Sequence, residues 1–260
     1  MEGNPKIGLT VDGPVATVTL NRPDKLNAID PAMLGRLEDV CGSLAGERDV
    51  RVVLLTGAGE RAFCVGADIN AWSGLAPLEM WRWWIRDGHR AFERLARLPQ
   101  PVIAVLNGHA FGGGLELALA ADLRVAAEGI ELALPEAKLG TVPGWGGTGR
   151  LPGLIGASRA KRMVFTGGRI DAATAERWGL VDEVAPRQEL MARAHALAAE
   201  IAANAPLSVQ IAKSLIDGAD GNASGVTLEA LAGALAATTN DGREGVAAFR
   251  ERRPPRFKGT

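Results

Sequence analysis

The sequence predicts an α/β fold whose C-terminal part is entirely helical. Near-continuous apolar runs at 49–56 and 101–106, bounded by glycine or proline, are typical of strands buried on both faces. Apolar residues recur at helical spacing between and after these runs, at 80–98 and 114–121. The strand signal stops after about residue 188, which favours an α/β body followed by a helical tail.

The remaining elements follow from local patterning along the chain. Residues 15–20 alternate in polarity and predict a strand that ends at the turn 21–24. Asp30 followed by Pro31 predicts the N-cap and first turn of a helix. Shorter strands are expected at 121–127, 130–134 and 181–184, and tail helices at 190–201, 207–216, 226–239 and 242–253.

Composition excludes several classes of protein. The 260 residues carry a net charge of −1, so no electrostatic footprint for nucleic acid or an anionic membrane is present. Two cysteines and three histidines are too few for a thiolate metal site or a disulfide framework, so no metal is expected. No run of 18 apolar residues occurs, and residues 1–6 lack an apolar signal core. We expect a cytoplasmic protein, and the excess of arginine over lysine (23 to 6) suggests a bacterial source.

Glycine is enriched, and twelve of the 33 glycines fall between residues 108 and 156. Gly112, Gly113 and Gly114 follow the strand predicted at 101–106 and open a helix, which leaves amide N–H groups unshielded by side chains. Such a turn can direct donors at an oxygen that becomes negative. A tight turn that serves packing alone explains the same pattern equally well.

A second turn of this kind follows the strand at 49–56. Asp68 is a plausible N-cap of the next helix, and the amide of Ala67 lies beside that helix start. Two amides from separate strand ends, those of Ala67 and Gly113, can form a two-donor oxyanion hole.

Two carboxylates stand in apolar surroundings close to these turns. Glu116 lies in the first turn after the three glycines, and Glu136 follows a short predicted strand. Either residue alone is explained by a structural role, as a helix-dipole partner or a first-turn acid. Together near an oxyanion hole they suit general acid–base chemistry on a carbonyl compound, because burial and repulsion can keep one of them protonated.

Two further patterns have weaker interpretations. Residues 144–149 have the GxGxxG spacing of dinucleotide-binding folds, but no clear strand precedes them and Pro152 interrupts the helix that should follow. We therefore assign them no nucleotide-binding role. Four tryptophans crowd residues 72–84, where bulky rings either shape a substrate pocket or simply form a core-facing stripe.

The motifs taken together resemble the crotonase (enoyl-CoA hydratase/isomerase) superfamily over about residues 7–259. None is specific alone. The matching segments are Asn21-Arg22-Pro23 with Asn27-Ala28, residues 55–57 and 63–69, Gly112 to Leu117, Pro135-Glu136 to Leu151, and Glu244 to Gly259.

The resemblance implies a fold and an assembly. It implies a spiral of ββα units, here residues 1–200, and a helical trimerisation region at 201–260. Relatives of this kind usually assemble as homotrimers or as homohexamers built from two trimers.

The resemblance also implies an acyl-CoA substrate and a site. The thioester oxygen would bind the amides of Ala67 and Gly113, while Glu116 and Glu136 would act as the acid–base pair. Coenzyme A itself, the only cofactor-like group expected, would contact Lys25, Ala28, Asp68, Ile69 and Lys258, with Lys258 contributed by a neighbouring subunit. Asn70 stands where some hydratases carry a lysine near the pyrophosphate.

Both glutamates are present, as in true hydratases of the superfamily, so we expect an enoyl-CoA hydratase that converts a trans-2-enoyl-CoA to a 3-hydroxyacyl-CoA. An enoyl-CoA isomerase, or a specialised crotonase for a branched or aromatic acyl group, is the alternative within the superfamily. A non-catalytic crotonase-fold binding protein is the alternative of a different class.

Overall fold

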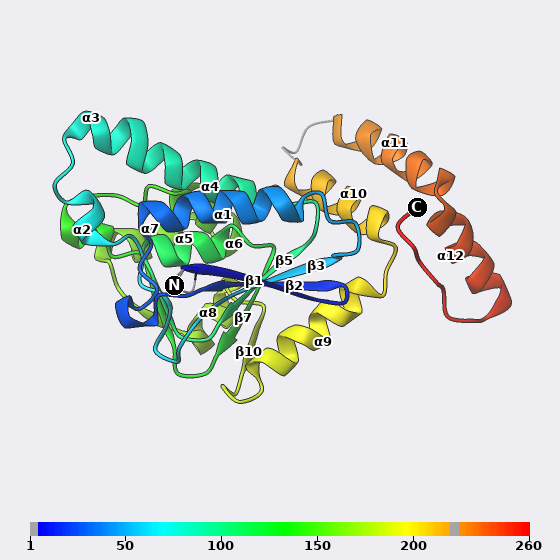
Figure 1. The fold of residues 1–260 in the computed structure, drawn as a ribbon, viewed down its shortest axis with the longest axis horizontal. Helices are drawn as coiled ribbons and strands as arrows, with labels where there is room; N and C mark the ends of the chain where they lie inside the picture. Colours follow the sequence, from blue (N-terminus) through cyan, green and yellow to red (C-terminus); the bar gives the residue numbers. More distant parts are fainter. Residues whose placement is uncertain (1–4, 219–223) are drawn as a thin grey trace.

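A computed structural model describes residues 5–218 and 224–260 of the chain, which form two β-sheets flanked by helices (Figure 1). The larger sheet has the strand order β1-β2-β3-β5-β7-β10, and only its β1–β2 pair is antiparallel. Its strands are β1 (Ile7–Asp12), β2 (Val15–Leu20), β3 (Val52–Gly57), β5 (Val102–Leu106), β7 (Leu123–Ala127) and β10 (Glu183–Ala185). The smaller sheet, in the order of its strands, comprises β4 (Ala62–Cys64), β6 (His109–Phe111), β8 (Glu131–Ala133) and β9 (Ile170–Asp171).

The helices connect these strands and form the tail. Before the tail they are η1 (Pro23–Lys25), α1 (Pro31–Leu44), α2 (Ile69–Trp72), α3 (Pro77–Glu79), η2 (Met80–Ile85), α4 (Arg86–Ala96), α5 (Gly113–Leu119), η3 (Glu136–Leu139), α6 (Gly147–Ile155), α7 (Ala157–Thr166) and α8 (Ala172–Trp178). They are followed by α9 (Leu190–Ala202), α10 (Pro206–Asp217), α11 (Ser224–Thr238) and α12 (Asn240–Glu251). Segments α3, η2 and α4 follow one another without a break.

Three consecutive strand pairs divide between the two sheets in the same way. The first strand of each pair (β3, β5, β7) joins the larger sheet, and the second (β4, β6, β8) joins the smaller one. A helical segment follows each pair, and β4, β6 and β8 run parallel to one another. The predicted spiral of ββα units is therefore confirmed.

The core lies around the larger sheet. Every residue of β3 and β5 is buried, as the continuous apolar runs predicted. Helix α1 lies above the sheet in Figure 1 and α9 lies below it. Asp30 caps α1, accepting a 2.9 Å hydrogen bond from the N–H of Met33, so the predicted helix start is confirmed.

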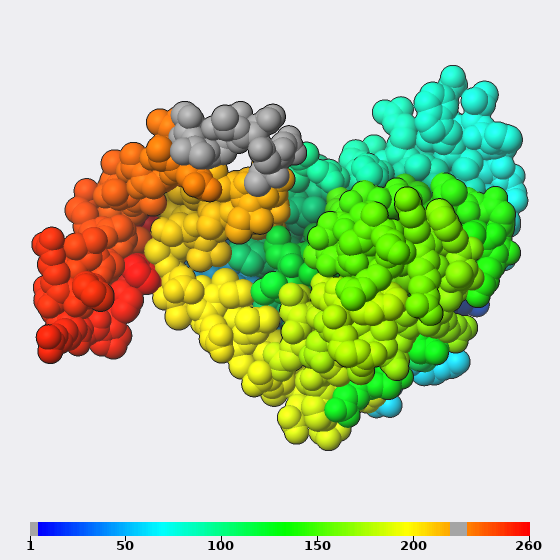
Figure 2. All heavy atoms as spheres, turned by 180° about the vertical axis from the view of Figure 1, so that it is seen from behind, coloured from blue at the N-terminus to red at the C-terminus, as the bar shows by residue number. Residues whose placement is uncertain are grey.

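The C-terminal helices leave the body of the molecule. Figures 1 and 2 show α11 and α12 as an arm that projects from one end. The domain boundary predicted after residue 200 stays a prediction; α9 itself ends at Ala202. Among the described helices none is long and apolar enough to cross a membrane. Residues 1–4, which contribute to the sequence argument against a signal peptide, are outside the described ranges.

Candidate active site

The smaller sheet brings three of the predicted site residues to one edge. Ala67 follows β4, Gly113 begins the helix after β6, and Glu136 follows β8. Because these three strands are parallel neighbours, their carboxyl ends meet at the same edge. The N–H of Gly112 donates a 3.0 Å hydrogen bond to the carbonyl of Ala133, which ties the end of β6 to the end of β8.

The amides of Ala67 and Gly113 lie close together and are free to bind a ligand atom. A Cβ built on Gly113 would lie 3.5 Å from the Ala67 nitrogen, and one on Gly66 would lie 3.2 Å from the Gly113 nitrogen. Among the hydrogen bonds of the described residues, neither N–H donates to another group of the chain. Two unpaired donors side by side can bind a single oxygen that gains negative charge.

The three successive glycines have separate steric roles. Gly112 has φ +53°, a conformation that side chains disfavour. A Cβ on Gly113 would lie 2.7 Å from the indole of Trp145, and one on Gly114 would lie 2.1 Å from the carbonyl oxygen of Cys64. The turn therefore lets α5 pack directly on β4, which explains the glycine run that the sequence analysis left open between packing and chemistry.

Glu116 is held in a buried cradle of main-chain donors. Its side chain projects from α5, and the residue is 2% exposed. Oε1 accepts hydrogen bonds of 2.8 Å from the N–H groups of both Trp145 and Gly147. Burial raises the pKa of Glu116, and these N–H donors act in the opposite direction by stabilising the ionised form.

Glu136 has a contrasting environment. It is half-buried at the start of η3, and its Oε2 is a buried atom without a hydrogen-bond partner among the described residues. Burial raises the pKa of Glu136 to about 7, and the negative charge of Glu116 adds to this effect. A Cβ on Gly112 would lie 2.8 Å from Oε1, so the carboxyl group is next to the oxyanion-hole turn. The two glutamates therefore have unlike environments, since main-chain N–H groups donate to Glu116 and one carboxyl oxygen of Glu136 accepts no hydrogen bond within the described part of the chain.

The predicted coenzyme A contacts of the body lie on two joined segments. The Arg22 guanidinium donates to the carbonyl of Ala28 at 2.7 Å and to Asp68 at 3.1 Å, and Ile29 bridges to Ala67. Asp68 also caps α2 by accepting from the N–H of Asn70 at 3.1 Å, so the predicted N-cap is confirmed. Lys25 and Ile69 are exposed on these segments. Arg22, which we had noted only as part of a motif, holds the two segments together.

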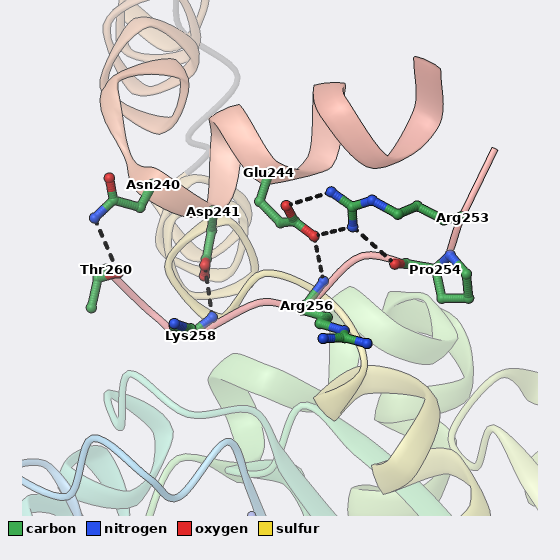
Figure 3. Close-up of a pocket in the computed structure, with 8 residues that line it drawn as sticks. All are labelled: Asn240, Asp241, Glu244, Arg253, Pro254, Arg256, Lys258 and Thr260. Atoms are coloured by element: carbon green, nitrogen blue, oxygen red, sulfur yellow. Dashed lines mark hydrogen bonds and ion pairs between the residues drawn. The ribbon is translucent and has the colours of Figure 1, made fainter. Parts of the chain in front are cut away.

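Lys258 lies apart from the other predicted site residues. Figure 3 shows the C-terminal tail folded back on α12, where Asp241 accepts 2.7 Å hydrogen bonds from the N–H groups of Lys258 and Gly259. The Arg51 side chain, just before β3, donates to the Phe257 carbonyl at 2.8 Å. This anchors the tail at the amino end of β3 in the larger sheet, whereas Ala67, Gly113 and Glu136 lie beyond the carboxyl ends of β4, β6 and β8 in the smaller sheet.

The glycine-rich loop 144–149 has a role that sequence reasoning missed. Its main-chain N–H groups at Trp145 and Gly147 form the Glu116 cradle. The available signal was the excess of small residues about thirty positions after Glu116. Sequence separation alone does not reveal that the main-chain N–H groups of this segment donate to that carboxylate. No strand directly precedes this segment, as the sequence indicated, but the expected interruption at Pro152 was wrong, because α6 runs from Gly147 to Ile155 with Pro152 inside it.

The crowded tryptophans divide into two kinds. Trp84 is buried and packs against the ring of Trp145, with centroids 5.2 Å apart, whereas Trp81 and Trp83 are 62% and 59% exposed. Within the described ranges no group of three or more His, Cys, Asp or Glu side chains could hold a metal ion. Burial raises the pKa of the Cys64 thiol to about 12, so this group is a poor nucleophile at neutral pH.

Comparison with known proteins identifies the family. Residues 10–260 match the family model described as enoyl-CoA hydratase/isomerase. The short-chain-enoyl-CoA hydratase of Clostridium acetobutylicum is 42% identical over 209 residues, which cover 80% of each chain. The (E)-benzylidenesuccinyl-CoA hydratase of Thauera aromatica is 39% identical over 256 residues, covering 97% of this chain and 99% of that one.

A solved structure agrees with the same assignment over nearly the whole chain. The crystal structure of an enoyl-CoA hydratase from Bacillus anthracis superposes with a TM-score of 0.94 at 40% identity, covering 98% of this chain and all of that one (100%). The model match and these relatives establish that the chain has the crotonase fold and belongs to the enoyl-CoA hydratase/isomerase family.

Proposed function

We propose that the protein is an enoyl-CoA hydratase that adds water across the C2=C3 bond of a trans-2-enoyl-CoA. The observation that carries this proposal is that Glu136 shares one sheet edge with two unpaired amide N–H groups, while Glu116, on the helix that starts there, is held by two main-chain donors. The enoyl thioester supplies the oxygen that these amides can bind, and the two carboxyl groups supply the proton transfers that hydration needs.

The proposed reaction follows from the two environments. The N–H groups of Ala67 and Gly113 bind the thioester oxygen. Ionised Glu116 removes a proton from water, whose oxygen forms a bond to C3 while the π electrons of C2=C3 move toward the thioester. Each donor of such a hole lowers the barrier by roughly 2.7–4 kcal/mol in comparable enzymes. Protonated Glu136 then delivers its proton to C2, giving the 3-hydroxyacyl-CoA without a metal or redox cofactor.

The test uses the absorbance of the enoyl thioester on incubation with crotonyl-CoA. We expect Glu116→Gln and Glu136→Gln each to lower kcat by roughly 10²–10⁴-fold, because each removes a proton-transfer group. Glu131→Gln, an exchange of the same kind at the start of β8, is the matched control and should retain activity. Circular dichroism should give the same folded spectrum for all three variants. Near-full activity in either of the first two would refute the mechanism.

The same measurement separates the alternatives. A hydratase removes the enoyl band, an isomerase creates it from a 3-enoyl-CoA, and a binding protein does neither. An increase in absorbance with 3-enoyl-CoA combined with no loss from crotonyl-CoA would replace the hydratase proposal with the isomerase.

Coenzyme A is proposed to lie along Lys25, Ala28, Asp68 and Ile69, with Lys258 supplied by a second copy of the chain. The hydrogen bonds of Arg22 that join the two body segments support the first part, and the placement of Lys258 beyond the amino end of β3 supports the second. Lys25→Ala and Lys258→Ala should raise KM for crotonyl-CoA with little change in kcat. An unchanged KM in both variants would exclude these contacts.

A homotrimer, alone or paired into a hexamer, is the assembly we propose. Three large apolar side chains of the C-terminal arm support it, because Leu231, Leu235 and Phe249 are all well exposed in the single chain. The cytoplasmic location expected from the sequence stays a prediction.

A further inference from the structure

The indole of Trp145 occupies an unusual position beside the proposed oxyanion hole. The residue is 2% exposed, although it belongs to the loop between η3 and α6. A Cβ on Gly113 would lie 2.7 Å from its Cε3 and Cζ3 atoms, and a Cβ on Gly88 would lie 2.1 Å from its Nε1. The ring is therefore clamped between α5 on one side and α4 on the other, at two positions that have no side chain.

The indole is the centre of a closed aromatic cluster. Trp84 and Phe92 each lie with ring centroids 5.2 Å from that of Trp145, and both are buried. The indole N–H donates a 3.4 Å hydrogen bond to the Trp84 carbonyl. Ile85 closes the adjacent gap, since its Cδ1 atom would lie only 2.7 Å from a Cβ at Gly144. Together Trp84, Ile85, Phe92 and Trp145 form what we call the aromatic wall.

The wall stands where the distal part of an acyl group has to go. The thioester oxygen would lie at the amides of Ala67 and Gly113, and C3 within reach of Glu116. The main chain of Trp145 holds Glu116 from behind, and its indole contacts Gly113. Carbon atoms beyond C3 therefore meet the wall after a short distance.

A surface cavity near the wall does not extend the site. It has a volume of about 470 Å³ and is lined by Ile85 and Gly144, the chain neighbours of Trp84 and Trp145, together with Trp81 and His89 among others. None of Ala67, Gly113, Glu116 or Glu136 lines it. Ile85 lines this cavity and the indole contacts Gly113, so these two side chains separate the proposed oxyanion hole from the cavity.

We propose that Trp145 is the specificity-determining residue of this enzyme and restricts it to short acyl groups of about four to six carbons. This inference rests on the proposed function, because it takes the site to bind an acyl thioester. Replacing the indole with a methyl group opens apolar space, and apolar cavities of about 150 Å³ accept a benzene-sized group.

The first experiment measures binding of saturated acyl-CoAs, which cannot be hydrated, by isothermal titration calorimetry. The wild type should bind butyryl-CoA at least ~10-fold more tightly than octanoyl-CoA. Trp145→Ala should reverse this order, since each methylene transferred to an apolar cavity changes affinity by roughly fourfold. Trp83→Ala, which removes an exposed tryptophan next to Trp84 in η2, is the matched control and should leave the ratio unchanged.

The second experiment measures kcat/KM for trans-2-enoyl-CoAs of four, six, eight and ten carbons. In Trp145→Ala the ratio of the eight-carbon to the four-carbon value should rise at least ~10-fold above that of the wild type. Trp145→Leu and Ile85→Ala, which open less space, provide the same test if Trp145→Ala does not fold, and each should raise the ratio by a smaller factor.

The outcomes are distinguishable from failure of the proposed function. The wild type could hydrate no enoyl-CoA and still bind butyryl-CoA more tightly than octanoyl-CoA, with this preference lost in Trp145→Ala. That result would refute the proposed hydratase activity and support the proposed role of the aromatic wall. Equal affinity of the wild type for butyryl- and octanoyl-CoA, or an unchanged ratio in all three wall variants, overturns the inference. Faster hydration of cinnamoyl-CoA than of crotonyl-CoA by the wild type overturns it as well.

Discussion

Substituting Gly88→Ala tests directly whether the indole of Trp145 lies on the backbone of α4. Alanine in a helix interior is favoured over glycine by about 1 kcal/mol, so replacing a glycine by alanine should stabilise the protein where the new methyl group meets no other atom. At Gly88 the new methyl group would lie 2.1 Å from Nε1 and 2.2 Å from Cε2 of the indole. Carbon atoms in contact are normally about 3.5–4.0 Å apart, so the ring or the helix has to move.

The expected magnitude is the balance of these two effects. Overpacking of a dense core costs roughly 1–3 kcal/mol, and the helix propensity returns about 1 kcal/mol. We therefore expect Gly88→Ala to lower the free energy of unfolding by about 0–2 kcal/mol. Gly35→Ala is the matched control: it lies within α1, a Cβ there meets no atom within 4 Å, and it should raise the free energy of unfolding.

A double-mutant cycle isolates the contact. In a Trp145→Ala background the obstruction is absent, so Gly88→Ala should raise the free energy of unfolding by about 1 kcal/mol. The coupling between the two sites is then roughly 1–3 kcal/mol. Unfolding midpoints in urea, followed by circular dichroism at one fixed protein concentration, give all four values. If Gly88→Ala stabilises the wild type as much as Gly35→Ala does, the clamped position of the indole is wrong.

Four further predictions concern other parts of the structure. The pKa of Glu136 is raised to about 7 from an ordinary value of 4.5, so between these pH values the folded protein holds a proton that the unfolded chain has released. The free energy of unfolding should therefore fall as pH rises through this window. In urea unfolding at a series of pH values, Glu136→Gln should reduce this dependence of the free energy of unfolding on pH. The hydration rate should also decline above about pH 7 as this acid ionises, and a rate that keeps rising to pH 9 would contradict its role. Asp241→Ala removes the acceptor of two tail N–H groups, so hydrogen exchange of residues 258 and 259 should accelerate. The melting temperature of the body should stay within about 2 °C of the wild-type value. Unchanged exchange would show that these hydrogen bonds do not hold the tail in place. Phe249→Asp, at a side chain 86% exposed, should shift the sedimentation coefficient toward that of a single chain, whereas Asp87→Asn on α4 should not.

The long elements of the fold were accessible from sequence because burial leaves a periodic pattern. The runs at 49–56 and 101–106 correspond to β3 and β5, and the helical spacing at 80–98 corresponds to the continuous segment from Pro77 to Ala96. Strands β4, β6 and β9, of two or three residues each, escaped prediction, whereas β8 and β10, which are as short, correspond to the strands predicted at 130–134 and 181–184. β1 was missed although it has six residues, since most of them face away from the core.

The candidate site was predictable to a different extent for each group. Glu116 and Glu136 were visible as carboxylates in apolar surroundings, and their unlike environments depend on neighbours far away in sequence. The Glu116 cradle uses backbone N–H groups, which every residue except proline possesses, so no residue type marks it. The aromatic wall was half visible: Trp84 belonged to the crowded tryptophans, but its partner Trp145 comes from a loop 61 positions later.

The division of the strand pairs between two sheets also affects how the chemistry of this protein can change. Ala67, Gly113 and Glu136 each come from a different repeat of the spiral, at the end of a short strand whose register is fixed by its parallel neighbour. A substitution of Glu136 therefore changes the proposed acid while Ala67 and Gly113, which carry the two amides, stay in place on other repeats. In the proposed mechanism, thioester binding and proton transfer are therefore assigned to different repeats, and a variant without Glu136 would keep the two amides for a different reaction on the same class of substrate.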